Sequence, residues 1–459
     1  MASKLQLGRL AFSLQARGVT TAAVLAHELG VSQPTLSRLL SSLGPRLERI
    51  GAHQSSRYAL RRDVRNLGSA WPVYRVDHEG RPILWGELRA LHGGFRLIPQ
   101  IAASARWLEG PYPGHQYPGL PFLLQDVRPQ GYIGRMIARQ VGAALGIAED
   151  PRDWSDDDLL AYLLAEGDDL PGDLVLGDRA LERALRRLGG LEEAACAWED
   201  REASYPALAE ASQRGEQVGS SAAGEQPKFL AAVRRGGDIS SVLVKFSPAG
   251  SSPSGIRWMD LLLCEHLAAE LLLTRAIPAS RTAILDAGGR RFLEVERFDR
   301  VRGRGRRGVL ALGSVEDGLL EGSSTDWTRS AAQLEQTGYL GHEEARRLRW
   351  LWCFGDMIAN SDMHRGNASV FFGTPPFTLA PAYDMLPMLH APGPQGELPV
   401  RHFAPRPPMP AVSDVWSDAA GAAVEFWGRV AADGRISSDY RGLAGDCGNL
   451  VAELQRKFA

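Results

Sequence analysis

The stretch NSDMHRGNASVFF, Asn360 to Phe372, breaks an apolar run with polar side chains, and PAYDMLP, Pro381 to Pro387, follows it. It places Asp362 and Asn367 five residues apart, with a second aspartate, Asp384, 17 residues further on. The apolar segments between them, ASVFF and FTLAPAY, predict a short β-hairpin. Carboxylate and amide oxygens are ligands of Mg²⁺, and an aspartate can also act as a general base. The pattern therefore predicts a site that combines a divalent cation with acid–base chemistry.

The spacing of Asp362 and Asn367 is that of the aspartate and asparagine in the catalytic loop of protein kinases. In such a loop the aspartate reaches the acceptor hydroxyl and the asparagine turns back toward the metal. We therefore expect Asp362 to be the base and Asn367 and Asp384 to hold Mg²⁺. The alternative is a capping aspartate and a turn asparagine, since isolated pairs of this kind are common. His364 can orient the loop and contact the nucleotide, although a structural histidine is the more frequent role.

Two charged residues upstream stand in apolar surroundings. Lys245 alternates with Val242 and Val244 in SVLVKFS, so it faces one side of a strand and can bind nucleotide phosphates. Its alternative role is that of an ordinary solvent-facing lysine. Glu265 lies in the apolar helix LLLCEHLAAELLL, where an unpaired carboxylate is costly. An ion pair between Lys245 and Glu265 would account for both.

The segment GSSAAGEQPKF, Gly219 to Phe229, is a loop of small residues before a strand. Its backbone amides can approach phosphates. It lacks the G-x-x-x-x-G-K-[ST] spacing, which excludes a P-loop. From this segment we expect ATP to be contacted by Ser221, Gly224, Gln226 and Lys228.

The composition is that of a soluble globular protein: 459 residues, 44% hydrophobic, 23% charged, with a net charge of −2. At about 150 residues per domain this length predicts roughly three units. We expect no signal peptide and no membrane span, because no long apolar run is present. The four cysteines form no CxxC pair, which argues against a zinc site or a disulfide framework and suits a cytoplasmic location.

The N-terminal segment is basic. Residues 1–65 contain ten Lys/Arg and three Asp/Glu, a net charge of +7, so the remainder carries −9. Residues 20–44 predict two helices around a turn at Gly30, with Ser32 able to cap the second helix and Pro34 in its first turn. RLERIGAHQSSRYALRRD then alternates like a two-stranded wing.

This spacing predicts a winged helix-turn-helix domain that binds duplex DNA. We expect contacts to base edges and phosphates from Ser32, Gln33, Thr35, Ser37, Arg38 and Arg57. The alternative is a helical hairpin that only packs, and the positive charge favours DNA binding. Paired domains would contact a palindromic site, so a homodimer is compatible with the sequence.

The order of strands and helices predicts an α+β fold with a bilobal body. We expect a winged helix-turn-helix domain at 1–66 and a small β-rich subdomain with a connector at 67–132. The kinase N-lobe region with the ATP-binding loop is expected at 133–325, and the helical C-lobe with the catalytic loop at 326–459.

Six motifs together resemble the HipA family of serine/threonine kinase toxins: SAAGEQPKF, LVKFS, CEHLAAELL, VERFDR, NSDMHRGNASVF and AYDMLPM. They occur in the family's order across roughly residues 71–390. The basic N-terminal segment resembles the YjjJ-type branch, in which a helix-turn-helix domain is fused to the kinase. The sequence departs from the family in reading CE where NE is expected, and residues 390–459 resemble it least.

The resemblance implies an ATP- and Mg²⁺-dependent protein kinase with Asp362 as base, Asn367 and Asp384 as metal ligands and Lys245 as the phosphate lysine. Ser221 falls at the position of the family's autophosphorylated serine. The implied substrate is a translation-related protein such as an aminoacyl-tRNA synthetase. Two other functions stay open: a transcriptional regulator with a catalytically silent, nucleotide-sensing body, and a small-molecule phosphotransferase.

Overall fold

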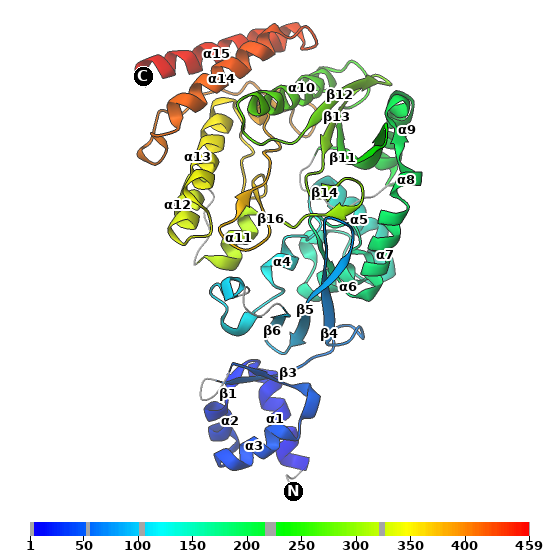
Figure 1. The fold of residues 1–459 in the computed structure, drawn as a ribbon, viewed down its shortest axis with the longest axis vertical. Helices are drawn as coiled ribbons and strands as arrows, with labels where there is room; N and C mark the ends of the chain where they lie inside the picture. The colour runs from blue at the N-terminus through cyan, green and yellow to red at the C-terminus, as the bar shows by residue number, and fades with distance from the viewer. Residues whose placement is uncertain (1–3, 52–55, 101–105, 216–225, 321–325, 459) are drawn as a thin grey trace.

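The computed structural model describes residues 4–51, 56–100, 106–215, 226–320 and 326–458. Figure 1 shows the N-terminal unit at one end, a body of mixed helices and sheets, and two C-terminal helices at the other end. The mixed α and β architecture is the one predicted. Within the described ranges, no helix combines the length and apolar character needed to cross a bilayer.

The N-terminal unit contains three helices, α1 (Lys4–Arg17), α2 (Ala22–Leu29) and α3 (Gln33–Ser41). They pack with an antiparallel sheet of order β1-β3-β2, formed by Thr20–Thr21, Arg57–Leu60 and Leu47–Ile50. Gly30 ends α2 in the left-handed region, with φ of 64°. Ser32 occupies the N-cap position of α3, but its hydroxyl bonds Thr35 Oγ1 at 3.0 Å and caps no backbone N–H.

The middle unit is built on an antiparallel sheet of order β7-β6-β5-β4-β8. Its strands are β4 (Ala70–Val76), β5 (Pro82–Leu91), β6 (Gly94–Pro99), β7 (Gln116–Tyr117) and β8 (Leu174–Leu176). Its helices are α4 (Phe122–Gln125), α5 (Gly131–Leu145), α6 (Asp156–Glu166) and α7 (Asp178–Gly189). Because β8 pairs with β4, this unit continues past the boundary expected at residue 132.

Buried and half-buried ion pairs join the first two units. Glu48 is 2% exposed and accepts from Arg61, Arg89 and Arg96, of which the last two belong to the middle sheet. Two further ion pairs join the segment after β3 to the acidic first turn of α6. They are Arg62–Asp157, at 2.6 Å, and Arg65–Asp158. Several cations of the basic segment are therefore neutralised within the protein.

The body above the middle unit begins with a five-stranded sheet of order β12-β13-β11-β10-β9. Its strands are β9 (Cys196–Ala197), β10 (Lys228–Arg235), β11 (Asp238–Phe246), β12 (Thr282–Ala287) and β13 (Arg290–Glu296). Two antiparallel hairpins, β10–β11 and β12–β13, form most of this sheet. The predicted apolar helix is α10 (Pro253–Thr274); α8 (Leu191–Ala194) precedes β9, and α9 (Arg201–Arg214) lies between β9 and β10 in the chain.

The second part of the body is mainly helical. It contains α11 (Leu312–Leu319), α12 (Trp327–Gln336), α13 (His342–Met357), α14 (Trp416–Ala432) and α15 (Ser438–Phe458). A small sheet of order β16-β17-β18 joins Val309–Ala311, Ser369–Phe371 and Thr378–Leu379. The β17–β18 pair is the hairpin predicted between Asn367 and Asp384. A minor hairpin, β14 (Arg300–Val301) with β15 (Gly305–Arg306), links the two parts.

The VERFDR segment after β13 is locked to the middle unit by a buried charge network. The Asp299 carboxylate forms ion pairs with Arg297 at 2.9 Å and with Arg300 at 2.7 Å. Arg300 forms a further ion pair with Asp169 at 2.7 Å. Burial alone would raise the pKa of Asp169, but Arg297 and Arg300 outweigh it and lower that pKa to about 2. Since both carboxylates stay ionised, this network fixes the middle unit against the edge of the upper sheet.

Candidate active site

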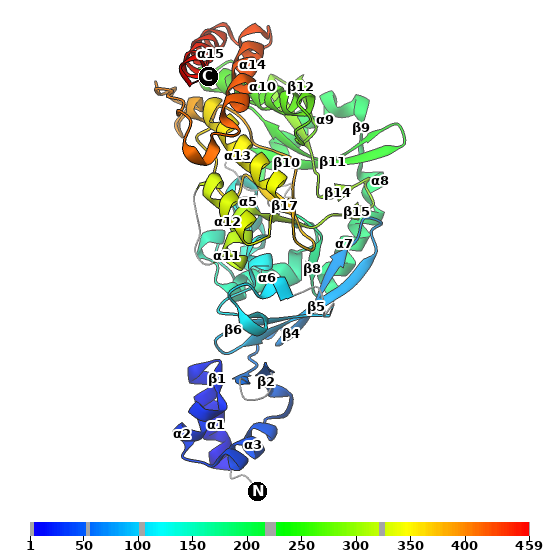
Figure 2. The same ribbon diagram turned by 60° about the vertical axis from the view of Figure 1, so that its left-hand side comes forward.

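A cavity of about 500 Å³ lies between the β10–β11 hairpin and the loop that follows α13. Figure 2 shows α13 and the two strands of this hairpin within the body. Apolar side chains from the upper sheet and its exit segment form one wall: Leu230, Leu243, Val295 and Phe298. Charged groups line the opposite end, and residues of the connector from the middle unit complete a third side. The volume is in the range that encloses a small-molecule ligand or cofactor.

Lys245 is the centre of the charged end. Its amino group donates to both oxygens of Glu265, at 2.6 and 2.8 Å, and to Asp384. The predicted ion pair between β11 and α10 is thus present, and Asp384 is a second anionic partner. Burial alone would lower the pKa of Lys245, but the two carboxylates outweigh it and raise that pKa, so the ammonium is retained.

The two carboxylates respond to this ammonium differently. Burial is the largest influence on Glu265 and raises its pKa despite Lys245. Burial also acts to raise the pKa of Asp384, but Lys245 and Lys228 overcome it and lower that pKa. Asp384 therefore stays an anion inside the cavity. Its backbone φ is 55°, a value that is unusual for a residue other than glycine. Such values are typical of functional positions.

Lys228 lies directly across from Lys245 in the β10–β11 register. It is 2% exposed and lines the same cavity. Two neighbouring strands therefore present cations to one end of the cavity, an arrangement that suits a polyphosphate.

The loop after α13 is held in tight turns by its own amides. Asn360 accepts from the Asp362 N–H at 3.0 Å and donates to the Asp384 carbonyl at 3.0 Å, so it joins the two acidic segments. Asn367 donates its amide nitrogen to the Asp362 carbonyl at 2.6 Å. This bond orients Asn367, whose side chain lines the cavity beside Asp384.

Asp362 is exposed and is not among the residues that line the cavity, but it lies two residues before His364, which does line it. Partial desolvation raises the pKa of its carboxyl, and Asp384 adds to the effect while His364 and Lys245 oppose it. His364 lines the cavity, and its Nδ1 accepts from the Gly366 N–H at 3.0 Å, which fixes the ring within the turn.

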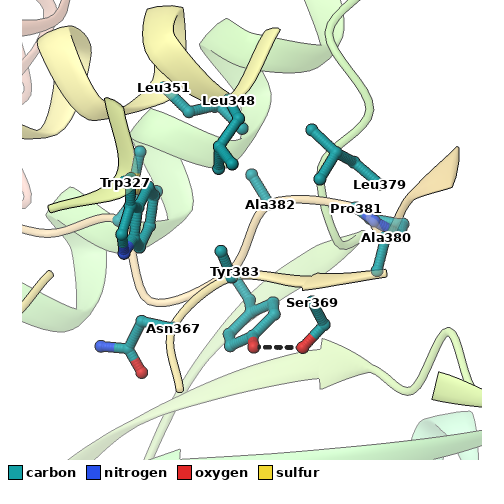
Figure 3. A pocket seen from close by; sticks show the side chains of 12 residues that line it. Trp327, Leu348, Leu351, Asn367, Ser369, Leu379, Ala380, Pro381, Ala382 and Tyr383 are labelled. Carbon is teal, nitrogen blue, oxygen red and sulfur yellow. Dashed lines mark hydrogen bonds between the residues drawn. The ribbon is translucent and has the colours of Figure 1, made fainter. Parts of the chain in front are cut away.

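Packing behind the loop supports its shape. The Tyr383 hydroxyl bonds the Ser369 hydroxyl at 2.7 Å (Figure 3). It also donates to the Gly366 carbonyl at 2.7 Å. Trp327 donates to the His364 carbonyl at 3.2 Å. The enclosed space that these side chains surround is about 10 Å³, which is too small for a ligand, so its role is structural.

Two carboxylates and one amide meet the requirements of a Mg²⁺ site in donor chemistry. Asn367 and Asp384 line one cavity, and Asp362 is tied to Asn367 through its backbone carbonyl. Among the described residues no cluster of three or more His, Cys, Asp and Glu side chains forms a self-sufficient metal site. A Mg²⁺ ion held here would depend on phosphate and water oxygens as well, which is how proteins usually bind it.

The connector contributes Gln125, Asp126, Arg128 and Gln130 to the third side of the cavity, a feature that sequence reasoning missed. Asp126 accepts from the Ala311 N–H at 3.2 and 3.3 Å. Burial raises the pKa of its carboxyl to about 6, despite hydrogen bonds from Ser314 and Ala311. Its position could not be foreseen because it meets β16, some 185 residues away in sequence.

The remaining predicted site residues fall in three groups. Ser221 and Gly224 lie outside the described residues. Gln226 is described, and its Nε2 is buried without a hydrogen-bond partner among the described residues. On α3, the residues exposed to solvent include Ser32, Gln33, Ser37 and Arg38, whereas Thr35 is half-buried.

Arg57 differs from the expectation. Its guanidinium donates to the Pro113 carbonyl of the middle unit at 2.7 Å, so it faces the body. The connector after residue 110 returns to the hairpin of the N-terminal unit, a contact that local sequence did not indicate. We therefore leave Arg57 out of the DNA-contacting set proposed below.

Family comparisons cover most of the chain. A family model described as YjjJ-like toxin, middle domain, matches residues 67–185, and one described as HipA-like C-terminal domain matches residues 220–421. Toxin YjjJ of Escherichia coli (strain K12) is 33% identical over 445 residues, which is 96% of this chain and 97% of that protein. The resemblance predicted from the six motifs is confirmed.

Two solved structures are also similar. One is the HipA protein of Shewanella oneidensis MR-1, solved with HipB and operator DNA; it is 15% identical, covers 84% of this chain and 95% of its own, and gives a TM-score of 0.45. The other is the Helicobacter pylori proinflammatory kinase CtkA, 10% identical, with coverage of 50% and 89% and a TM-score of 0.36.

Replacing Asp126 with Asn should change how stability depends on pH. The folded-state pKa of Asp126, about 6, lies above its ordinary value of 3.8, so the folded state binds more protons between those limits. Stability from this group is therefore present at low pH and is lost as pH rises from about 4 to about 6, by about 1–3 kcal/mol. Urea unfolding across this range should show a flatter profile for Asp126→Asn than for wild type; parallel profiles would contradict the burial argument.

Proposed function

Since the chain belongs to the family of YjjJ-like toxins with a HipA-like C-terminal domain, we propose that it is an ATP- and Mg²⁺-dependent protein serine/threonine kinase. The observation that carries the proposal is the buried Lys245 ammonium between Glu265 and Asp384, in the cavity bordered by the Asp362–Asn367 loop. A purely structural role would not require Lys228 and Lys245, the two lysines of the β10–β11 hairpin, to face the same cavity as two acidic groups.

In this proposal the phosphates of ATP lie at Lys228 and Lys245, and the base packs against the apolar wall formed by Leu230, Leu243, Val295 and Phe298. Asn367 and Asp384 hold Mg²⁺, which supplies positive charge for the phosphoryl oxygens. Glu265 keeps Lys245 oriented, since an ammonium held by two carboxylates has little freedom to leave the cavity floor.

Asp362 acts as the base. The hydroxyl oxygen of the acceptor attacks the γ-phosphorus, its proton passes to the Asp362 carboxylate, and the bond to the β–γ bridging oxygen breaks to release ADP. The raised pKa of Asp362 makes it a better proton acceptor than an aspartate with the ordinary pKa. Asn360 and Asn367 hold the loop that carries this carboxylate.

The family resemblance suggests the acceptor. We propose a serine of a translation-related protein, such as an aminoacyl-tRNA synthetase, and autophosphorylation at Ser221. A phosphate on Ser221 would add about −1.5 to −2 charge to the segment that precedes β10 in the sequence. A small-molecule acceptor and a silent, nucleotide-sensing body are the alternatives that the experiments below distinguish.

We also propose that residues 1–66 bind duplex DNA. The supporting observation is that α3 exposes Ser32, Gln33, Ser37 and Arg38 near its N-terminus, after a turn at Gly30. Hydroxyl, amide and guanidinium groups in this position suit base edges and phosphates. The ion pairs of Arg62 and Arg65 reduce the charge available to DNA below the formal +7 of this segment.

Asp362→Ala should reduce phosphate transfer from γ-labelled ATP to the chain itself, or to a protein of a cell extract, by about 10²–10⁴-fold, because the general base is lost. The matched control is Asp439→Ala, which removes an exposed aspartate at the start of α15 and should keep wild-type activity. Equal labelling by wild type and Asp362→Ala would contradict the assignment. Labelling of small hydroxyl compounds alone would support the phosphotransferase.

Arg38→Ala should weaken binding of the full chain to duplex DNA and reduce the slope of affinity against salt concentration by about one unit, since one phosphate or base contact is lost. Arg152→Ala is the control, because Arg152 is an exposed arginine of the middle unit, 85% exposed in its side chain. Fluorescence anisotropy with labelled duplexes measures both. Absence of binding by wild type at low salt would refute the DNA proposal.

A further inference from the structure

A second pocket, of about 280 Å³, lies where three segments meet: the turn between β4 and β5, the link between β15 and β16, and the β17–β18 hairpin. Figures 1 and 2 both show the β4–β5 hairpin of the middle unit extending to the β14–β15 hairpin of the body. Among the described residues, this pocket and the 500 Å³ cavity share no lining side chain. We call it the Arg307 pocket, and its polar lining comes from Arg75, His78, Arg307, Thr374 and Thr378.

The charged side chains of the Arg307 pocket are all cationic, and in the described part of the chain no aspartate or glutamate lines it. Arg75 pairs with Asp173 at 2.6 Å, so the charge of Arg75 is largely offset. Within the described ranges Arg307 forms no ion pair, and its guanidinium stacks on the Phe371 ring, with Cζ 3.2 Å from the ring centroid. Burial lowers the pKa of Arg307, and no carboxylate acts against this effect. The pocket therefore holds one partly desolvated cation that no described carboxylate neutralises.

The hydrogen-bond donors of the pocket are directed at an oxyanion in number and kind. A guanidinium that stacks on a ring keeps its N–H edge for bonds in its own plane, and this edge matches phosphate or carboxylate oxygens. Arg75 uses Nε on Asp173 at 2.7 Å and Nη2 on the Phe372 carbonyl at 3.3 Å, so its Nη1 bonds nothing among the described residues. Further donors come from three exposed residues, His78, Thr374 and Thr378.

We propose that the Arg307 pocket binds a phosphate monoester, with the phosphate on the N–H edge of Arg307 and within reach of Arg75 Nη1. A phosphate monoester presents three acceptor oxygens and more than one negative charge, whereas a carboxylate presents two oxygens and one charge. Donors from five side chains surround the pocket, which favours the ligand with more acceptors. Two sources share this chemistry, a free small molecule and a phosphorylated side chain of a protein.

The location gives the ligand a route to the candidate active site. The β17–β18 hairpin, which forms one side of the Arg307 pocket, lies between Asn367 and Asp384 in the chain. Phe371, on which Arg307 stacks, meets Phe298 of the cavity wall edge to face, with 6.1 Å between the ring centroids. A bound phosphate would therefore join the middle unit to the hairpin that separates the two candidate metal ligands. Phosphate binding itself does not depend on the proposed kinase activity.

Ligand-observed NMR titration of the full chain with a capped phosphoserine tripeptide, up to about 10 mM, tests the proposal. Wild type should bind, and Arg307→Gln should weaken binding by about tenfold or more, because a charge-assisted hydrogen bond is lost. The matched control is Arg304→Gln, which removes an exposed arginine of the neighbouring β14–β15 turn that does not line the pocket and should bind as wild type does. No binding by wild type, or equal binding by Arg307→Gln, would overturn the proposal.

His78→Ala decides the matter if Arg307→Gln loses its fold. His78 is an exposed residue of the β4–β5 turn, so its replacement should leave the melting temperature unchanged and weaken phosphopeptide binding about threefold or more. Wild-type affinity in this variant would show that the phosphate lies elsewhere.

Probe chemistry and competition complete the test. The same tripeptide with glutamate or serine in place of phosphoserine should bind at least tenfold more weakly, and equal binding of the glutamate peptide would contradict the phosphate assignment. Free phosphoserine that binds as tightly as the peptide supports a small molecule as the source, and weaker binding supports a phosphorylated protein segment. Binding should persist with a non-hydrolysable ATP analogue and Mg²⁺ in excess; displacement would place the phosphate in the main cavity and overturn the proposal. If the analogue does not bind at all, the proposed function fails, while the comparison of Arg307→Gln with Arg304→Gln still decides phosphate binding.

Discussion

The Lys245 ammonium, held between the carboxylates of Glu265 and Asp384, is the interaction on which the site depends. It is 4% exposed, so it keeps its charge only because two anions share it. The three residues come from β11, from α10 and from the segment after β18, and their contact fixes those elements around one end of the cavity. The same contact sets the electrostatic state of the site, because Lys245 keeps Asp384 ionised and also influences Asp362.

The cavity is not the product of the HipA-like region alone. Its third side comes from the connector that precedes α5, in the part matched by the YjjJ-like middle domain. The network of Asp169, Arg297, Asp299 and Arg300 holds that unit against the VERFDR segment. Since Arg297 and Asp299 also line the cavity, a shift of the middle unit would change the shape of the proposed nucleotide site.

Sequence reasoning succeeded where local pattern determines structure. The apolar segments between Asn367 and Asp384 predicted the β17–β18 hairpin, and the cost of an isolated buried carboxylate predicted the Lys245–Glu265 pair. It did not predict the roles of Asp126 and Tyr383, or the two hydrogen bonds by which Asn360 joins the acidic segments. The partners of these residues are determined by how distant segments pack. The prediction that Arg57 contacts DNA overlooked a distant contact of the same kind. The bond from Arg57 to Pro113 depends on the path of the connector.

The central claim is that a nucleotide and a divalent cation bind between the Lys245 group and the Asp362 loop. A crystal structure with a non-hydrolysable ATP analogue and Mn²⁺, whose anomalous signal locates the ion, tests it most directly. We predict Mn²⁺ bonded to oxygens of Asp384 and Asn367 at about 2.0–2.3 Å, with the Lys245 amino group on a phosphate oxygen. A nucleotide bound elsewhere, or an ion that contacts neither residue, would contradict the account.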